Sequence, residues 1–319
     1  MKTAYPLVSV IIPTYNRASM VGNAIQSVLS QNYPNKEIIV IDDGSIDDTA
    51  SVVQKFDNVH YILQEHKGQA SARNNGWKHA KGKYIASLDS DDIWESGFLE
   101  KCIHRLEKFD LDFVFSNWNQ QSDDGQFRNC FSTYPLVEPF LHLAVDSWVL
   151  LDHEQVRSIY IKGCPSPSSS LVIRASSLKL GWNEKINIGD DWCMLLDMIF
   201  SKTIKAAFTT ECLWHKKINC NNIYDGRCQV EVNKLLWVAD STIMFSQYRK
   251  LLSTNEKRFL EKRFLESLIL SAKHNLLHYS NYGECFRNTK QALLINPFYT
   301  TRLFSQKFYR ILSRSLGLF

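Results

Sequence analysis

The 319-residue sequence lacks several patterns that mark whole classes of protein. It has no run of about 18 or more apolar residues, which argues against a membrane-spanning helix. No Gly-x-Gly-x-x-Gly follows the first apolar run, which argues against a dinucleotide oxidoreductase. The net charge of +4 is small, and no nucleic-acid-binding motif is present, so we expect no nucleic acid partner.

Cysteine spacing excludes two further classes. Eight cysteines in a chain of this length do not indicate a disulfide framework, and no paired Cys-x₂-Cys is present. Cys212, His215, Cys220 and Cys228 are close in sequence, but their spacing does not match a zinc site. No apolar segment of a signal peptide follows Met1, so we expect a reduced protein that works in the cytoplasm.

An acidic cluster follows a short apolar run near residue 90. Tyr84 to Leu88 reads as a buried strand, and Asp89, Asp91 and Asp92 come directly after it. Clustered carboxylates repel each other unless a cation or hydrogen-bond donors compensate, and Mg²⁺ commonly bridges such carboxylates to phosphates. The alternative is a helix N-cap with solvated acids.

The first 90 residues alternate strand-like and helix-like patterns. Strands are predicted at 9–12, 37–41, 59–63 and 84–88, and the helices between them at 20–29, 48–56 and 70–80. Such alternation predicts βαβ units and a mostly parallel sheet flanked by helices. Ligands bind outside the carboxyl ends of such strands, so Thr14, Asp43 and Asp91 are predicted to line one crevice.

Four motifs in order resemble the family 2 glycosyltransferases. They are Val8 to Arg17, Ile41 to Ser45, Ala72 to Gly76, and Leu88 to Asp92. This resemblance implies an inverting enzyme with a GT-A fold, which is a Rossmann-like α/β architecture. It covers roughly residues 7–115 well, continues more weakly to about residue 220, and leaves out the remainder.

The resemblance implies a role for each matching residue. Thr14 and Tyr15 are expected at the base and ribose, Asp43 at uracil, and Asp42 in support of its turn. Arg73 and Asn74 are expected to face the donor phosphates and sugar, although a surface helical arginine is an alternative for Arg73. The other predicted donor-site residues are Pro13, Asn16, Arg17 and Ser90. Asp89, Asp91 and Asp92 match the family's site for Mn²⁺ or Mg²⁺, with Asp91 as the expected direct ligand and Asp92 holding the loop or a metal-bound water.

A second acidic pair precedes an apolar helix pattern that begins near residue 190. The family carries its catalytic base at this place, which implies that Asp191 takes the proton of the acceptor hydroxyl, with Asp190 as neighbour or substitute. The alternative is an acidic N-cap stabilised by the helix dipole. Further on, the sequence departs from the family pattern: His215 and Lys216 or Lys217 are displaced in register, and Asp197 stands where an arginine is common. His215 and Lys217 are kept as candidate metal or diphosphate contacts.

We predict three regions: a nucleotide-sugar-binding half at 1–115, an acceptor half at 116–222, and a helical extension at 223–319. The loop Pro165 to Ser170 either borders the acceptor site or is a plain connector. Four tryptophans are either acceptor-stacking or core residues: Trp118, Trp148, Trp182 and Trp192. Beyond Glu284 the sequence has only basic charges, interleaved with aromatic residues. Such a tail either lies in an anionic membrane interface or packs back as a helix.

The sequence therefore predicts a metal-dependent glycosyltransferase with a nucleotide-sugar donor, expected to be UDP-linked. Its acceptor is expected to be a hydroxyl of a glycan or lipid-linked sugar, at the inner face of the plasma membrane. One alternative is a phosphatase or phosphotransferase with Asp89 as nucleophile. That class usually carries its Asp-x-Asp after the first strand, followed by Thr or Val. The other alternative is a non-catalytic sugar-nucleotide-binding module.

Overall fold

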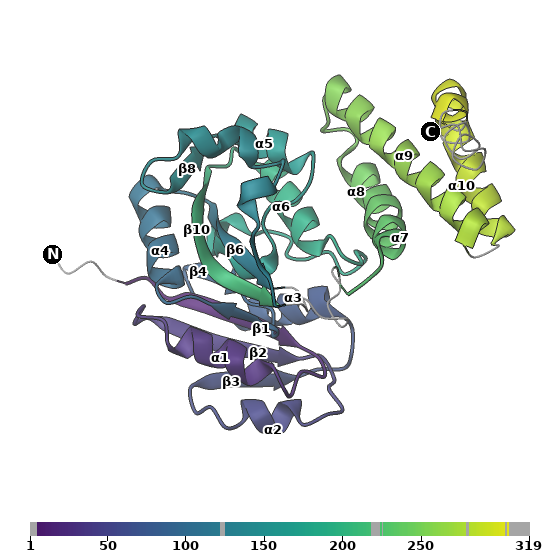
Figure 1. The fold of residues 1–319 in the computed structure, drawn as a ribbon. Helices are drawn as coiled ribbons and strands as arrows, with labels where there is room; N and C mark the ends of the chain where they lie inside the picture. Colours follow the sequence, from purple (N-terminus) through teal and green to yellow (C-terminus); the bar gives the residue numbers. More distant parts are fainter. Residues whose placement is uncertain are drawn as a thin grey trace. The chain divides into compact units, whose positions relative to one another are not determined.

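The computed structural model describes residues 5–121, 125–217, 224, 226–278, 281–303 and 305. The chain forms two units, each with its own internal contacts (Figure 1). Unit 1 holds Met1–Glu184 and Gly189–Asn219, and unit 2 holds Lys185–Ile188 and Cys220–Phe319. The predicted division at residues 115 and 116 falls inside a strand, β6 (Phe113–Gln121), and stays a prediction.

The first four strands of unit 1 are parallel, as predicted. They are β1 (Val8–Thr14), β2 (Lys36–Asp42), β3 (Val59–Leu63) and β4 (Tyr84–Ser87), and they lie in the order β3-β2-β1-β4. All of β1 and β4 and most of β2 are buried, which explains their nearly continuous runs of β-branched residues. The carboxyl ends of β1, β2 and β4 therefore lie next to one another.

Three helices connect these strands: α1 (Val21–Leu29), α2 (Thr49–Val53) and α3 (Gln69–His79). α3 packs on the sheet face that carries Ile39 and Ile41. Gly76 permits its close approach, because a Cβ added there would lie 2.4 Å from Cγ2 of Ile11. The backbone of α3 is thereby held close to β1, which places Arg73 and Asn74 near the strand ends.

The second half of the sheet is mixed, and it lies beyond the strand–helix alternation from which parallel strands were predicted. β9 (Leu171–Arg174) is antiparallel to both of its neighbours, β4 and β6. Its direction follows from its start: Leu171 leaves a loop that is anchored at the carboxyl end of β4, so the strand runs back along β4. β10 (Ala206–Lys217) pairs parallel with β6 and antiparallel with β5 (Asp92–Trp94).

The other elements of unit 1 complete the sheet and cover it. The short strands at its margin are β7 (Phe127–Asn129) and β8 (Trp148–Leu151). The helices are α4 (Phe98–Phe109), α5 (His153–Tyr160) and α6 (Asp190–Ser201). Short 3₁₀ turns lie at Phe131–Thr133, Glu138–Leu143, Ser168–Ser170 and Ala175–Ser177. One face of α6 is buried, including Trp192, Leu195 and Ile199, and this burial fixes where the helix begins.

Most of the described part of unit 2 from Gln229 onward is helical, which confirms the predicted helical extension. It contains α7 (Gln229–Val232), a π-helical segment (Asn233–Asp240), α8 (Ser241–Tyr248), α9 (Thr254–His278) and α10 (Tyr282–Ile295). α9 and α10 share a core that includes Leu265, Leu268 and Ala292. The Asp240 carboxylate accepts backbone hydrogen bonds from Asn187 and Ile188, each at 2.8 Å, so it ties residues 185–188 to unit 2.

The sequence also led to predictions about membrane-spanning helices, the state of the cysteines and the basic tail. Within the described residues, no helix is long and apolar enough to cross a membrane. The described cysteines are free, whereas Cys220, part of the disfavoured zinc set, lies outside the described residues. The basic residues Lys307, Arg310 and Arg314 of the tail also lie outside them, so its membrane contact stays a prediction.

Candidate active site

Polar side chains gather where the parallel strands β1, β2 and β4 end. Thr14 is the last residue of β1 and pairs with Asp42, the last residue of β2. Leu88 follows β4, and its N–H donates to the carbonyl of Ile11 in β1 at 3.0 Å, so Asp89 begins at the same edge. The three motifs thus lie at one edge of the sheet, as the sequence predicts.

The turn after β1 presents an exposed ring. Asn16 has a φ of 51°, and its backbone N–H donates to Oγ of Ser45 at 2.8 Å. Tyr15 is 40% exposed and stacks on the ring of His66, with centroids 4.1 Å apart. The buried Oγ1 of Thr14 finds no hydrogen-bond partner among the described residues. The turn therefore offers an aromatic surface beside a polar group that a ligand can satisfy.

The two acids after β2 organise loops. Asp42 is fully buried and accepts from the backbone N–H of Ser45 and from the hydroxyl of Tyr61, each at 2.8 Å, which suits its predicted support of the turn. Asp43 accepts from the backbone N–H groups of Lys67 at 2.9 Å and Gly68 at 2.7 Å. It also accepts from Nε2 of Gln64 at 2.7 Å and lies 2.9 Å from Nδ1 of His66. Asp43 thus holds residues 64–68, including the His66 ring, beside Tyr15, and its contact with uracil stays a prediction.

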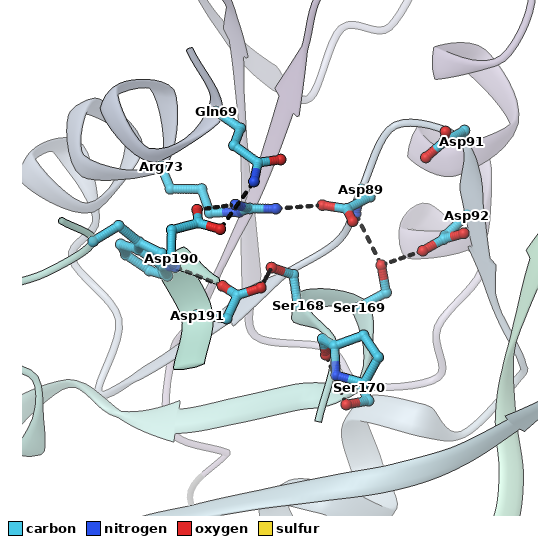
Figure 2. A network of polar contacts seen from close by, with 12 residues as sticks. Gln69, Arg73, Asp89, Asp91, Asp92, Ser168, Ser169, Ser170, Asp190 and Asp191 are labelled. Atoms are coloured by element: carbon cyan, nitrogen blue, oxygen red, sulfur yellow. Dashed lines mark hydrogen bonds and ion pairs between the residues drawn. The ribbon is translucent and has the colours of Figure 1, made fainter. Parts of the chain in front are cut away.

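A buried arginine joins the two acidic motifs (Figure 2). Arg73 on α3 is 2% exposed, so the alternative of a surface arginine is wrong. Its Nη2 lies 2.7 Å from Oδ1 of Asp89, and its Nη1 lies 2.6 Å from Oδ2 of Asp190. Gln69, one turn earlier on α3, donates to Oδ1 of Asp190 at 2.9 Å. Both terminal nitrogens of Arg73 are therefore engaged by carboxylates, and its predicted contact with donor phosphates is untested.

Burial and charge shift the ionisation of this network. Burial raises the pKa of Asp190 to about 7, with the Arg73 guanidinium opposing and the Asp191 and Asp89 carboxylates adding to the rise. Burial alone would lower the pKa of Arg73, but Asp191, Asp190 and Asp89 raise it above its usual value. Burial thus favours the protonated form of Asp190 while the Arg73 guanidinium favours its charged form, and Arg73 itself stays charged.

Ser169 connects the acidic cluster internally. Its fully buried hydroxyl donates to Oδ2 of Asp92 at 2.5 Å and accepts from the backbone N–H of Asp89 at 3.1 Å. The Ser169 carbonyl in turn accepts from Nε1 of Trp94 at 2.7 Å. The loop that the sequence left as either a connector or an acceptor border thus lies inside the site, beside the carboxylates (Figure 2).

Asp191, the predicted base, is held from two sides. Its Oδ1 accepts from Nε1 of Trp182 at 2.7 Å, and its Oδ2 accepts from the hydroxyl of Ser168 at 2.5 Å. Asp190 and Asp191 are the first two residues of α6. The N-cap residue is Gly189, which has no side chain to cap the helix. Both acids bind partners outside their own helix, so a simple N-cap role does not explain them.

The tryptophan interpretations are settled by burial. None of the four candidates exposes more than 5% of its surface: Trp118, Trp148, Trp182 and Trp192. Their hypothetical role of stacking on acceptor sugars is wrong in this structure, because their rings fill the core. Trp118, for example, stacks on Trp214 at 5.3 Å.

The acidic cluster offers carboxylate oxygens as ligands for a divalent cation. Oδ1 of Asp92 is buried and has no hydrogen-bond partner among the described residues. Burial and the nearby Asp89 raise the pKa of Asp91, as expected for carboxylates crowded together without a full counter-charge. Within the described residues, no three His, Cys, Asp or Glu side chains already converge on one point. Oxygen ligands of this type fit Mg²⁺ or Mn²⁺ once they converge.

Strand β10 brings a basic residue to the cluster. Lys216 pairs with Asp92 in the β10–β5 register, and its charge lowers the pKa of Asp91 and Asp92 against the larger effect of burial. His215, one residue earlier, binds Oε1 of Glu95 through Nε2. The side chain of Lys217 lies outside the described residues, so its predicted role stays open. Arg17 approaches the cluster from the β1 side, 3.8 Å from Asp91.

From the sequence, Gln69 and His66 were missed, and the serine loop and Trp182 were named only as possible acceptor contacts. Ser168, Ser169, Trp182, Gln69 and His66 all contact predicted site residues. Serine-rich loops and single tryptophans have no distinctive spacing, so only the three-dimensional structure reveals these contacts. Ser90, a predicted donor-site residue, is 6% exposed, and no contact here tests its role.

Removing the buried guanidinium should destabilise the protein in a pH-dependent way. Arg73→Met leaves Asp89 and Asp190 without their counter-charge, and we expect a loss of about 3–5 kcal/mol in the free energy of unfolding. The loss should be larger at pH 8 than at pH 5. A carboxyl whose folded-state pKa exceeds its unfolded value contributes stability at low pH that disappears as the pH rises through the folded-state pKa. Without Arg73 the pKa of Asp190 rises above its wild-type value of about 7, so the variant loses more stability than the wild type between pH 5 and pH 8.

Urea denaturation at the two pH values measures this effect. Lys83→Met is the matched control, because Lys83 is 46% exposed in its pair with Glu107, and such surface pairs contribute about 1 kcal/mol or less. Equal losses for the two variants, or no dependence on pH, would contradict the assignment of Arg73 as the central counter-charge.

Known glycosyltransferases resemble the first half of the chain. The family model "Glycosyl transferase family 2" matches residues 9–162. The UDP-Glc:alpha-D-GlcNAc-diphosphoundecaprenol beta-1,3-glucosyltransferase WfaP of Escherichia coli is 37% identical over 161 residues, covering 48% of this chain and 63% of WfaP. The chain spans between 18% and 50% of the length of the other curated relatives.

Solved structures agree on the fold. S. aureus TarS 1-349 in complex with UDP-GlcNAc has a TM-score of 0.63 and 16% identity, covering 90% of this chain and 81% of that TarS chain. The mannosyltransferase PcManGT of Pyrobaculum calidifontis, solved with GDP-Man and Mn²⁺, has a TM-score of 0.58 and 18% identity, covering 96% of this chain and 85% of its own. The strand-end site, the family match and these folds agree: over residues 9–162 the chain is similar to glycosyl transferase family 2, and its fold is the GT-A fold.

Proposed function

We propose that the chain is an inverting glycosyltransferase that moves a sugar from a UDP-linked donor to a hydroxyl of a lipid-linked glycan. The observation that carries the proposal is the Asp89–Arg73–Asp190 ion network, which joins the acidic cluster after β4 to the acids that begin α6. WfaP, by its printed name, uses UDP-Glc and a diphosphoundecaprenol-linked GlcNAc, and TarS was solved with UDP-GlcNAc. These neighbours support the choice of donor and acceptor.

In the proposed reaction, the acceptor hydroxyl attacks the anomeric carbon while the bond to the diphosphate breaks on the opposite face. The diphosphate leaves with the electron pair, and the Asp191 carboxylate takes the hydroxyl proton. Tyr15 and the neighbouring His66 supply the stacking surface for the nucleobase. A single displacement inverts the anomeric configuration, so no protein nucleophile is needed.

The donor diphosphate is expected to bind at the acidic cluster through a divalent cation. We assign Asp91 as the direct ligand, with Asp89 beside it and Asp92 fixed by Ser169. Bound Mg²⁺ or Mn²⁺ supplies Lewis-acid stabilisation of the charge that develops on the leaving group. Arg17 and Lys216 lie beside the same carboxylates and add positive charge to that end of the site.

Turnover tests the proposed reaction directly. With UDP-glucose and GlcNAc-diphosphoundecaprenol in detergent, the wild type should release UDP and elongate the lipid. Asp191→Asn should lower kcat by about 100-fold or more, because a general base contributes at least that much. Asp197→Asn, on the same helix, is the matched control and should keep its rate. The proposal fails if Asp191→Asn retains turnover, or if no UDP-sugar in a panel supports transfer.

Calorimetry tests the metal-dependent donor site. UDP should bind the wild type in the presence of Mn²⁺ and at least tenfold more weakly without it, since the cation bridges carboxylate and phosphate. Asp91→Asn should abolish the Mn²⁺ enhancement, whereas Asp48→Asn, an exposed acid at the start of α2, should keep it. Mn²⁺-independent binding of UDP to all three proteins would exclude the assigned cation site.

We also propose that unit 2 contacts an anionic membrane surface. Phe286, Leu294 and Phe298 are 70%, 78% and 88% exposed, and the chain has only basic charges after Glu284. This combination is typical of interfacial helices. Phe298→Glu should weaken binding to vesicles containing phosphatidylglycerol about tenfold, and Ile46→Glu, equally exposed in unit 1, should not. Binding that is absent in the wild type, or unchanged in Phe298→Glu, would refute the contact.

A further inference from the structure

The two hydrogen bonds to Asp191 come from donors of different chemistry. Oδ1 accepts from the indole Nε1 of Trp182, and Oδ2 accepts from the hydroxyl of Ser168. An indole N–H only donates and cannot take up a proton, whereas a hydroxyl rotates and both donates and accepts. One oxygen of the carboxylate therefore has a fixed partner, and the other has a partner that can turn away.

Trp182 is itself clamped. Its backbone N–H donates to Oδ1 of Asn74, and its carbonyl accepts from Nδ2 of Asn74, both at 2.8 Å. Gly181, just before it, has a φ of +72°, and a Cβ added there would lie 2.4 Å from Oδ1 of Asn74. Asn74 stands on α3, whose backbone is held against β1 at Gly76. Trp182 is 3% exposed, and the hydrogen bonds between its main chain and Asn74 hold its indole ring in place.

The charge of Asp191 in turn raises the pKa of four other buried groups. They are Arg73 on α3, Asp190 on α6, Tyr160 on α5 and Cys164 in the following loop. Trp182 and Ser168 differ from them because they bind the carboxylate oxygens directly. Another core tryptophan of the chain binds a carbonyl rather than a carboxylate: the indole N–H of Trp192 donates to the carbonyl of Tyr160 at 2.6 Å.

We propose that Trp182, clamped by Asn74, is the positioning residue of the base. By occupying Oδ1 it fixes the plane of the carboxylate and leaves Oδ2 to receive the proton of the acceptor hydroxyl once the Ser168 hydroxyl has turned away. The proton moves from the acceptor oxygen to Oδ2, and the diphosphate leaves as in the proposed reaction. The inference rests on the proposed function, because it requires Asp191 to be the base.

The pH dependence of turnover tests this role. Trp182→Phe keeps an aromatic ring but loses the N–H, and loss of a hydrogen bond to a carboxylate favours its protonated form. The acidic limb of kcat/KM should therefore move up by about one pH unit, and kcat should fall about tenfold, with KM for UDP-glucose unchanged. Trp192→Phe removes the indole N–H of the residue that follows Asp191, and it should leave the acidic limb of kcat/KM in place.

A second measurement does not depend on turnover. The indole ¹H–¹⁵N signal of Trp182, identified by its loss in Trp182→Phe, should shift with pH in the wild type and stop shifting in Asp191→Asn. An acidic limb that is the same in Trp182→Phe and in Trp192→Phe, or an indole signal unaffected by Asp191→Asn, would overturn the positioning role while leaving the glycosyltransferase assignment intact. Full activity of Asp191→Asn would instead refute the base, and the positioning role with it.

Discussion

The site depends on one buried charge, the guanidinium of Arg73. Its two terminal nitrogens bind Asp89 and Asp190, which belong to different segments and would repel each other if they were brought together alone. Burying an arginine costs several kcal/mol unless carboxylates surround it in good geometry, and here they do. The arginine therefore sets the separation between the acidic cluster after β4 and the start of α6.

A layer of neutral hydrogen bonds extends this ionic centre. Ser169 binds Asp92 and the backbone of Asp89, while Ser168 binds Asp191, so two neighbouring serines reach both acidic motifs. On the other side, Asn74 stands next to Arg73 on α3 and clamps the main chain of Trp182. The charge of Arg73 brings the motifs together, and these directional hydrogen bonds orient the individual carboxylates. The site is therefore preorganised.

The strands and their acidic ends could be predicted because the signals are local. An apolar β-branched run followed by aspartate needs only neighbouring residues, and so does the pattern that begins α6. The network around Arg73 could not be predicted, because its partners stand 16 and 117 residues away. The direction of β9 was not predicted, since a four-residue apolar strand reads the same in either orientation. The serine loop was left as either an acceptor border or a connector, because no periodicity distinguishes a buried polar turn from an exposed one.

The antiparallel strand β9 also sets the timing of folding during synthesis. The first four strands are continuous in sequence and can pair as soon as they leave the ribosome, but β9 begins only beyond Ser169, 80 residues after Asp89. At about 5–20 residues per second, the free edge of β4 waits roughly 4–16 s for its neighbour. An unpaired edge is a template for aggregation. The same insertion that closes the edge delivers the two serines, so the nascent chain covers β4 and places Ser168 and Ser169 beside the acidic cluster in one event.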